Sequence, residues 1–183
     1  MKIPTNTLLP VDELIRLLSL TGDDSNNLIN YANEVKLNSI GNTVYFRGLI
    51  EFSNRCTKNC FYCGIRAGNS DLDRYDLTDN DILDAARFAY DNRYGSIALQ
   101  GGERSDATFV KRIDILVKKI KQLSNNQLGI TLSLGEQTKE TYQRWFESGA
   151  HRYLLRVETS NRELYSKIHP QDRFHNFDNR LEA

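Results

Sequence analysis

Three cysteines within eight consecutive residues restrict the fold of this chain more than any other feature of its sequence. Cys56, Cys60 and Cys63 are its only cysteines and follow the spacing C-x3-C-x2-C. They come directly after the apolar stretch 44–52, and a loop that follows a strand can bring three such sulfurs to one point. Four protein ligands close a structural zinc site or an ordinary iron–sulfur site, whereas three leave one metal position open. The spacing therefore indicates a four-iron four-sulfur cluster in which one iron can bind a small molecule.

Two other uses of the cysteines have to be weighed. A zinc site with three cysteines needs a fourth ligand, and His151, His169 and His175 all lie far from the cysteines in sequence. A disulfide framework is disfavoured by the odd number of cysteines, their tight spacing and the lack of a secretory signal. A structural zinc-binding module without catalysis therefore remains the alternative.

Charge and hydropathy exclude several classes of function. The sequence has 24 Lys and Arg residues against 24 Asp and Glu residues, with no basic block, so a nucleic-acid partner is not expected. No apolar stretch approaches the ~18 residues that a membrane span needs, and the first residues do not resemble a signal peptide. Unpaired cysteines agree with a reducing compartment. We therefore expect a cytoplasmic protein without a membrane partner.

The pattern of apolar residues changes after residue 42. Before it, we expect one helix that opens at Pro10 and a second that is capped within residues 23–25, followed by a turn at 38–42. Beyond it, apolar strands alternate with amphipathic helices. The expected strands cover 44–52, 96–100, 129–134 and 152–157, and the expected helices start near Thr78, cover 109–120, and run from Thr138 to Gly149. The sequence thus predicts a helical cover over residues 1–42 and a core domain over residues 43–183.

Alternating strands and helices with short links predict an α/β fold with a parallel sheet and right-handed crossovers. Four such βα units make half of a (β/α)8 TIM-type barrel, which typically needs ~250 residues. The sequence stops at 179–183 inside an expected helix. We therefore expect the N-terminal half of a barrel from a longer protein, a fragment that by itself turns over poorly or aggregates.

Polar residues follow the end of each expected strand. The cysteines follow the first strand, and Gln100 and Glu103 flank a pair of glycines after the second. Ser133 and Glu136 follow the third strand, and Arg156 and Glu158 lie near the end of the fourth. Barrel enzymes place their active sites at the carboxyl ends of the strands. The four sets therefore predict one site at that end of the barrel.

The cysteine motif, with the aromatic Tyr62 before its last cysteine, resembles the signature of the radical S-adenosylmethionine (SAM) enzymes. From about residue 44 onward, segments 50–54, 62–66, 131–136 and 152–159 resemble the HydE branch, the [FeFe]-hydrogenase maturases, with methylornithine synthase and biotin synthase as alternatives. The resemblance implies a TIM-type barrel, a 4Fe–4S cluster, and reductive cleavage of SAM to a 5′-deoxyadenosyl radical. It also implies a small-molecule or small iron-complex substrate, an external electron donor, and other hydrogenase maturases as partners.

The resemblance further implies roles for individual residues around SAM. Three cysteines would hold the cluster, whose open iron would be chelated by the amino and carboxylate groups of SAM. No side chain is expected to act as a catalytic base or nucleophile. The residues implied to contact SAM are Tyr62 beside the adenine, Gly101, Gly102 and Glu103 at the amino group, Ser133, Glu158 at the ribose hydroxyls, and Arg180 at the carboxylate.

Two residues are implied to face the substrate, Arg156 and Thr131. Arg156 and Glu158 could equally form a salt bridge at the barrel rim, and Thr131 and Ser133 could be neutral fillers of the barrel. Among the remaining polar residues, we expect Arg66, Arg74, His169 and His175 to be solvated charges, and we expect Trp145 to belong to the core.

Overall fold

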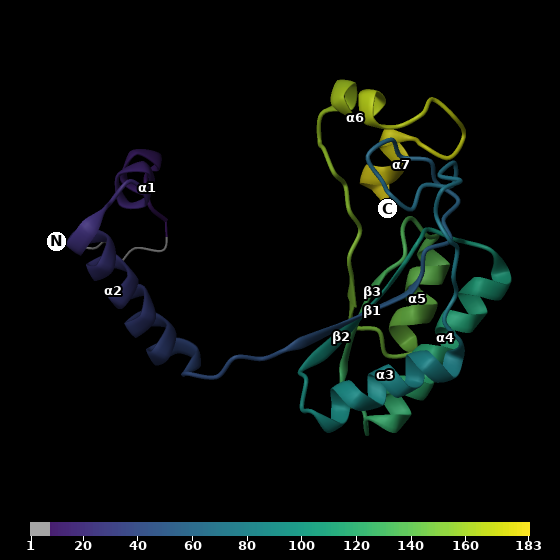
Figure 1. Ribbon diagram of the computed structural model, residues 1–183, viewed down its shortest axis with the longest axis horizontal. Coiled ribbons are helices and arrows are strands. Elements are labelled where there is room, and N and C mark those ends of the chain that lie inside the picture. The colour runs from purple at the N-terminus through teal and green to yellow at the C-terminus, as the bar shows by residue number, and fades with distance from the viewer. Residues whose placement is uncertain (1–7) are drawn as a thin grey trace. The chain divides into compact units, whose positions relative to one another are not determined.

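The computed structural model describes residues 8–183, which form two compact units divided after Val44 (Figure 1). The first unit contains helices α1 (Val11–Leu18) and α2 (Gly22–Ile40). Helix α1 begins directly after Pro10, as predicted, whereas α2 begins after Thr21 and therefore before the expected capping residues. That the pair covers one end of the barrel stays a prediction. Within residues 8–183, no helix combines the length and the apolar character needed to cross a membrane.

The second unit is built on a parallel sheet whose spatial order, β1-β2-β3-β4, follows the chain. The strands are β1 (Arg47–Ser53), β2 (Ser96–Gly101), β3 (Gly129–Ser133) and β4 (Arg152–Tyr153). The helices that connect them are α3 (Asp79–Asp91), α4 (Ala107–Leu123) and α5 (Lys139–Glu147). Two further helices, α6 (Arg162–Ile168) and α7 (Phe177–Glu182), follow β4. The predicted α/β fold with four βα units is confirmed.

One hydrophobic core holds the sheet to the connecting helices. Ile97 and Leu99 of β2 are fully buried, whereas Ala98 and Gln100, which alternate with them, are partly exposed. Alternation of this kind means that one face of the sheet packs against helices and the other lines the interior of the half-barrel. Helix α4 contributes the largest apolar face of the three helices, as its spacing predicts. The expected core residue Trp145 is buried, and its indole donates a hydrogen bond to the carbonyl of Val110.

Local capping signals in the sequence fix where the helices begin. Thr78 and Asp81 form a reciprocal capping box at the start of α3, and Thr138 accepts a hydrogen bond from the backbone N–H of Thr141 at the start of α5. Both starts agree with the prediction. The chain after α5 turns through Gly149 at φ +114° to enter β4.

The fourth strand is much shorter than predicted. Only Arg152 and Tyr153 pair with β3, and the backbone N–H of Leu154 donates the last hydrogen bond to that strand. Since β4 is the edge of the sheet, residues 154–159 have no second strand to hold them in the ladder. The backbone also turns at Glu158, whose φ is +65°. Arg156 and Glu158 therefore lie on an irregular segment and do not share the face of a strand.

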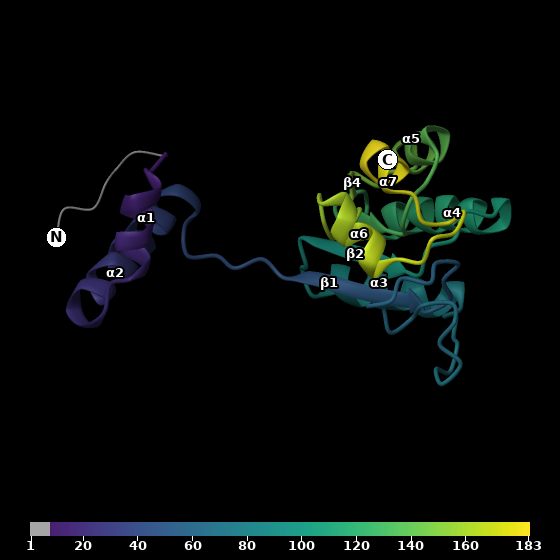
Figure 2. The same cartoon turned by 90° about the horizontal axis from the view of Figure 1, so that it is seen from above.

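Helix α6 was not predicted, whereas α7 lies where the sequence predicts a helix at the end of the chain. They lie beyond the carboxyl ends of the strands, beside the loop that follows β1 (Figure 1; Figure 2). Backbone atoms connect the two regions, because the N–H of Phe61 donates to the carbonyl of Ile168 at 3.0 Å. The loop that contains the cysteines is thus covered by the segment that follows β4.

Candidate active site

The carboxyl ends of the four strands surround one cavity of about 150 Å³. It brings together nearly all the residues that the sequence predicts for a site. Those that line it are Cys56, Cys60, Tyr62, Cys63, Gly101, Gly102, Glu103, Ser133, Arg156, Glu158 and Arg180. Thr131 is the exception, because it is buried away from the cavity and its hydroxyl has no hydrogen-bond partner.

Backbone N–H groups point at the first cysteine. The sulfur of Cys56 accepts hydrogen bonds from the N–H of Lys58 at 3.4 Å and from the N–H of Glu103 at 3.3 Å. Thr57 ties the same two segments together, because its N–H and its hydroxyl both donate to the carbonyl of Glu103. Such donors stabilise a thiolate and influence the reduction potential of a cluster bound to it.

Two of the thiols are held in a partly buried environment. Burial raises the pKa of Cys56 and of Cys60, and the neighbouring cysteines raise both further. The thiols therefore keep their protons near neutral pH unless a cation compensates the thiolate charge. Metal binding at this loop would accordingly release protons.

In the part of the chain that the structure describes, the cysteine loop and its neighbouring histidine do not form a four-ligand zinc site. Among residues 8–183, no three His, Cys, Asp or Glu side chains lie close enough together to hold a single metal ion. Cysteines that hold a cluster each bind a different iron and need not converge on one point. The nearest histidine is also engaged: Nε2 of His175 lies 3.6 Å from Sγ of Cys60, but it accepts the N–H of Asn59 at 3.2 Å while Nδ1 pairs with Asp172 at 2.7 Å. His175 is therefore poorly placed as a fourth ligand.

Two glycines allow the close packing around the cysteine loop. A Cβ atom on Gly102 would overlap the carbonyl of Arg55 and approach Cβ of Cys56 to 2.7 Å. A Cβ atom on Gly135, whose φ is +78°, would overlap the carboxylate of Glu103. Gly102 thus lets the end of β2 pack against the cysteine loop. Gly135 leaves space for the side-chain carboxylate of Glu103, the residue predicted to bind the amino group of the cofactor.

Four charged side chains meet beside the cysteines and form what we call the charge quartet: Lys58, Glu103, Glu136 and Arg180. Lys58 lies 3.1 Å from each carboxylate, and Arg180 lies 3.4 Å from Glu103 and 2.6 Å from Glu136. All four side chains are largely buried. The carboxylates raise the pKa values of Lys58 and Arg180 against the opposing effect of burial, so both cations stay charged.

The other predicted cofactor residues lie around the rim of the cavity. Arg156 and Glu158 are exposed, and no ion pair links them in the part of the chain that the structure describes. The hydroxyl of Tyr62 lies 3.2 Å from Nε2 of His169. Burial raises the pKa of Tyr62, and nearby Cys60 raises it further, so the hydroxyl is protonated and can donate to His169.

The contacts that His169, His175 and Arg74 make at the site were not predicted from the sequence. His169 and His175 are buried beside the cysteine loop and are not solvated charges, because the α6–α7 segment packs onto that loop. Arg74 donates hydrogen bonds to four backbone carbonyls and so organises the residues after Cys63. Lys58 could have been noticed from its place between two cysteines, whereas nothing in the local sequence marks the histidines.

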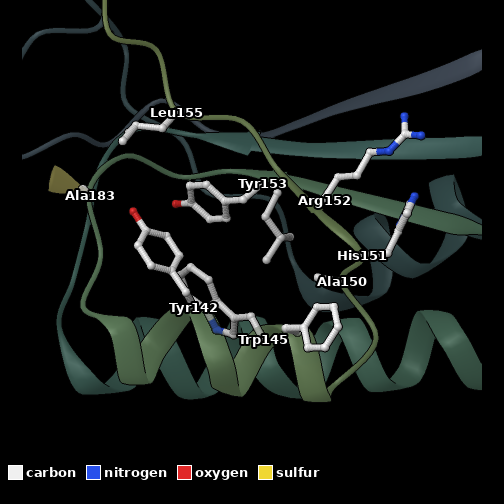
Figure 3. A pocket seen from close by; sticks show the side chains of 10 residues that line it. Tyr142, Trp145, Ala150, His151, Arg152, Tyr153, Leu155 and Ala183 are labelled. Carbon is white, nitrogen blue, oxygen red and sulfur yellow. The ribbon is translucent and has the colours of Figure 1, made fainter. Parts of the chain in front are cut away.

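A second cavity, of about 310 Å³, lies between α5 and the β4 edge of the sheet (Figure 3). Its wall is mainly aromatic: Tyr153 packs edge-on against Tyr142 at 4.7 Å between centroids and parallel to Trp145 at 6.2 Å. It contains none of the predicted site residues. We therefore assign the chemistry to the cavity at the cysteines.

Comparison with known proteins places the chain among enzymes of one superfamily. A family model described as the radical SAM superfamily matches residues 50–183. The [FeFe] hydrogenase maturase subunit HydE of Thermotoga maritima is 41% identical over 149 residues, which is 81% of this chain and 42% of that protein. The 3-methylornithine synthase of Methanosarcina acetivorans is 30% identical over 160 residues, which is 86% of this chain and 45% of that protein. The chain thus spans less than half the length of these curated relatives.

Solved structures give the same grouping. A crystal structure of HydG, a maturase of the [FeFe]-hydrogenase, covers 91% of this chain with a TM-score of 0.72 at 27% identity, and the match covers 37% of that protein. A crystal structure of methylornithine synthase (PylB) covers 93% with a TM-score of 0.73 at 28% identity, and the match covers 50% of that protein.

Proposed function

We propose a function from the premise that this chain belongs to the radical SAM superfamily. Members of that superfamily use a 4Fe–4S cluster and S-adenosylmethionine. When bound, the cluster supplies the electron that cleaves the sulfonium carbon–sulfur bond of SAM to give a 5′-deoxyadenosyl radical. The protein side chains bind and orient these groups and keep water out. We propose that this chain provides the cofactor-binding half of such an enzyme.

The observation that supports this proposal is the meeting of three cysteines and an opposite-charge pair in one cavity. Cys56, Cys60 and Cys63 would hold the cluster, and the N–H groups that point at Cys56 would stabilise its thiolate. Glu103 and Arg180 offer a carboxylate and a guanidinium to the amino and carboxylate groups of SAM. Tyr62, Ser133 and Glu158 would contact the adenosyl part, and Arg156 the substrate.

We further propose that the enzyme acts in the assembly of the [FeFe]-hydrogenase cofactor, since the HydE of Thermotoga maritima is 41% identical to this chain. Its substrate would then be a small molecule or small iron complex, with an external electron donor and other hydrogenase maturases as partners. Free cysteines support a reducing, cytoplasmic location. Methylornithine synthase is the second candidate, supported by its 30% identity over 86% of this chain.

Anaerobic reconstitution of the polypeptide that contains this chain tests the proposal. We expect about four irons and four sulfides per chain, an EPR signal that SAM shifts, and release of 5′-deoxyadenosine on reduction. Cys60→Ser should abolish all three, whereas Ser70→Ala, an exposed position in the following loop, should not. Tight stoichiometric zinc without a cluster would instead establish the structural zinc module.

Complementation separates the two candidate reactions. In a strain that lacks HydE, the polypeptide should restore [FeFe]-hydrogenase activity, and the Cys60→Ser variant should fail to do so. Restoration of methylornithine synthesis in a strain that lacks that enzyme, without restoration of hydrogenase, would assign the second candidate.

A further inference from the structure

The charge quartet contains two residues to which the proposed function gives no role, Lys58 and Glu136. Lys58 belongs to the cysteine loop and Glu136 to the segment after β3, so three separate strand ends and α7 contribute to the four charges. The side chains of Lys58 and Arg180 are 8% and 9% exposed, and those of Glu103 and Glu136 are 12% and 18% exposed. Charges this deeply buried are stable only when each has partners of opposite sign.

The four charges alternate in sign around a closed ring. Each cation contacts both carboxylates, so the quartet has a net charge of zero. Lys58 also donates a hydrogen bond to the carbonyl of Phe174, which fixes the ammonium from a third side. The ring therefore holds Glu103 and Arg180 in place before any ligand arrives.

One contact of the ring, between Glu103 and Arg180, faces the cysteine cavity. The 3.4 Å distance between Glu103 and Arg180 is the longest of the four, and both residues line the cavity. Glu136 does not line it and lies behind, at a neighbouring polar cavity. Its contact with Arg180 is short but not aligned as a hydrogen bond, and Oε1 of Glu136 has no other donor.

We propose that Lys58 and Glu136 are positioning residues that keep Glu103 and Arg180 ready for the zwitterionic head of an α-amino acid. This inference rests on the proposed function and deepens it. The head enters between Glu103 and Arg180, where its amino group faces the carboxylate and its carboxylate faces the guanidinium. Glu103 then keeps Lys58 as partner and Arg180 keeps Glu136, so every buried charge remains paired and the net charge stays zero.

Removal of Lys58 and removal of Glu136 should weaken ligand binding for opposite reasons. In Lys58→Met, two carboxylates compete for Arg180, which is then less available to the ligand carboxylate. In Glu136→Gln, two cations compete for Glu103, which is then less available to the ligand amino group. The double variant again has one carboxylate and one cation, and the two effects should cancel in part.

Binding of two nucleosides to the cluster-loaded protein tests this inference by calorimetry. S-adenosylhomocysteine has the amino-acid head, whereas 5′-methylthioadenosine lacks it. We expect each single variant to weaken S-adenosylhomocysteine binding at least tenfold and the double variant to recover most of that loss. Lys58→Arg should bind within threefold of the wild type, and the affinity for 5′-methylthioadenosine should stay the same throughout.

Three results would overturn the inference. The first is an unchanged affinity for S-adenosylhomocysteine in both single variants, and the second is an equal loss of affinity for both nucleosides in any variant. The third is a double variant whose loss of binding free energy equals the sum of the two single losses. The melting temperature and iron content of each variant show whether it has folded and loaded its cluster. If Lys58→Met does not fold, the affinity of Lys58→Arg for S-adenosylhomocysteine decides whether a cation at this position is needed. A wild-type protein that binds neither cluster nor S-adenosylhomocysteine would refute the proposed function, and the inference with it.

Discussion

Gly135 shows how a single residue determines the position of the predicted SAM ligand Glu103. Its φ of +78° is a backbone conformation that residues other than glycine rarely adopt, and a Cβ atom there would overlap the Glu103 carboxylate. The carbonyl of Gly135 also accepts a hydrogen bond from the hydroxyl of Tyr153 at 2.7 Å, which fixes the turn on β4. The position of the Glu103 carboxylate therefore depends on the absence of a side chain at Gly135 in this turn.

Substitution Gly135→Ala should displace the carboxylate of Glu103. Steric overlap and backbone strain of about 1–3 kcal/mol at this position should lower stability and weaken SAM binding by tenfold or more. Iron content should stay close to normal, since the atoms nearest to the added Cβ all belong to Glu103 and none to a cysteine. Gly95→Ala is the matched control, because a Cβ atom there would meet only Tyr45 at 3.8 Å. Equal SAM affinity in both variants would refute the coupling.

His169 should make the stability of the metal-free protein depend on pH. Burial lowers the pKa of His169, although its hydrogen bond to the carbonyl of Tyr165 opposes the shift. The unfolded chain therefore binds a proton, below about pH 6.5, that the folded chain does not bind. Above that pH the histidine is neutral in both states and does not lower the free energy of unfolding. As the pH falls below it, protonation of the unfolded chain lowers the free energy of unfolding.

The measurement is the free energy of unfolding in urea at several pH values. We expect the wild type to lose stability between about pH 6.5 and pH 5, before most carboxylates titrate. His169→Gln should remove most of that loss, whereas Ser166→Ala on the exposed side of α6 should keep it. A slope in His169→Gln equal to that of the wild type would contradict the assignment.

At the scale of elements, the segment 168–175, which runs from the last residue of α6 toward α7, restrains the cysteine loop. It contacts that loop through backbone and side chains at several points along its length. The contacts are Ile168 with Phe61, His169 with Tyr62, Phe174 with Lys58, and His175 with Asn59 and Cys60. A loop held at so many points should be ordered before a cluster binds.

Substitution His175→Ala should loosen the cysteine loop. It leaves the N–H of Asn59 without its acceptor, at a cost of about 1–3 kcal/mol. We expect faster hydrogen exchange across residues 58–62 and faster loss of iron to a chelator. Gln171→Ala changes an exposed residue of the same segment and should leave both rates at the wild-type values. Wild-type exchange rates in His175→Ala would show that the segment does not restrain the loop.

The same segment shows what sequence patterns predict and what they miss. The capping box at Thr78 and the apolar face of α4 depend on neighbours within a few residues, and both were predicted. The cysteine spacing is equally local, and it predicted residues that the structure brings together in one cavity. The contact of His175 with Asn59 joins residues 116 apart, and the length of β4 depends on whether another strand lies beside it. Such features depend on tertiary packing and leave no local signal.

At the scale of the whole molecule, the β4 edge has no strand on its outer side in the region that the structure describes. The aromatic cavity between α5 and β4 opens beside this edge, with Leu154 47% and Phe146 68% exposed. Unpaired backbone next to apolar surface promotes association of strands between molecules. The chain 1–183 in isolation should therefore self-associate through this edge.

Substitution Phe146→Glu tests where that association occurs. A charge on the rim of the aromatic cavity should repel a second copy and shift the isolated chain toward monomer by at least tenfold in dissociation constant, measured by sedimentation velocity. Phe88→Glu on α3 is the matched control, because Phe88 is similarly exposed, at 61%, and does not line the cavity. A chain that is monomeric at all concentrations, or one that both variants shift equally, would show that the β4 edge does not drive association. Loss of association in Phe146→Glu alone would identify the β4 edge as the surface through which copies of the chain associate.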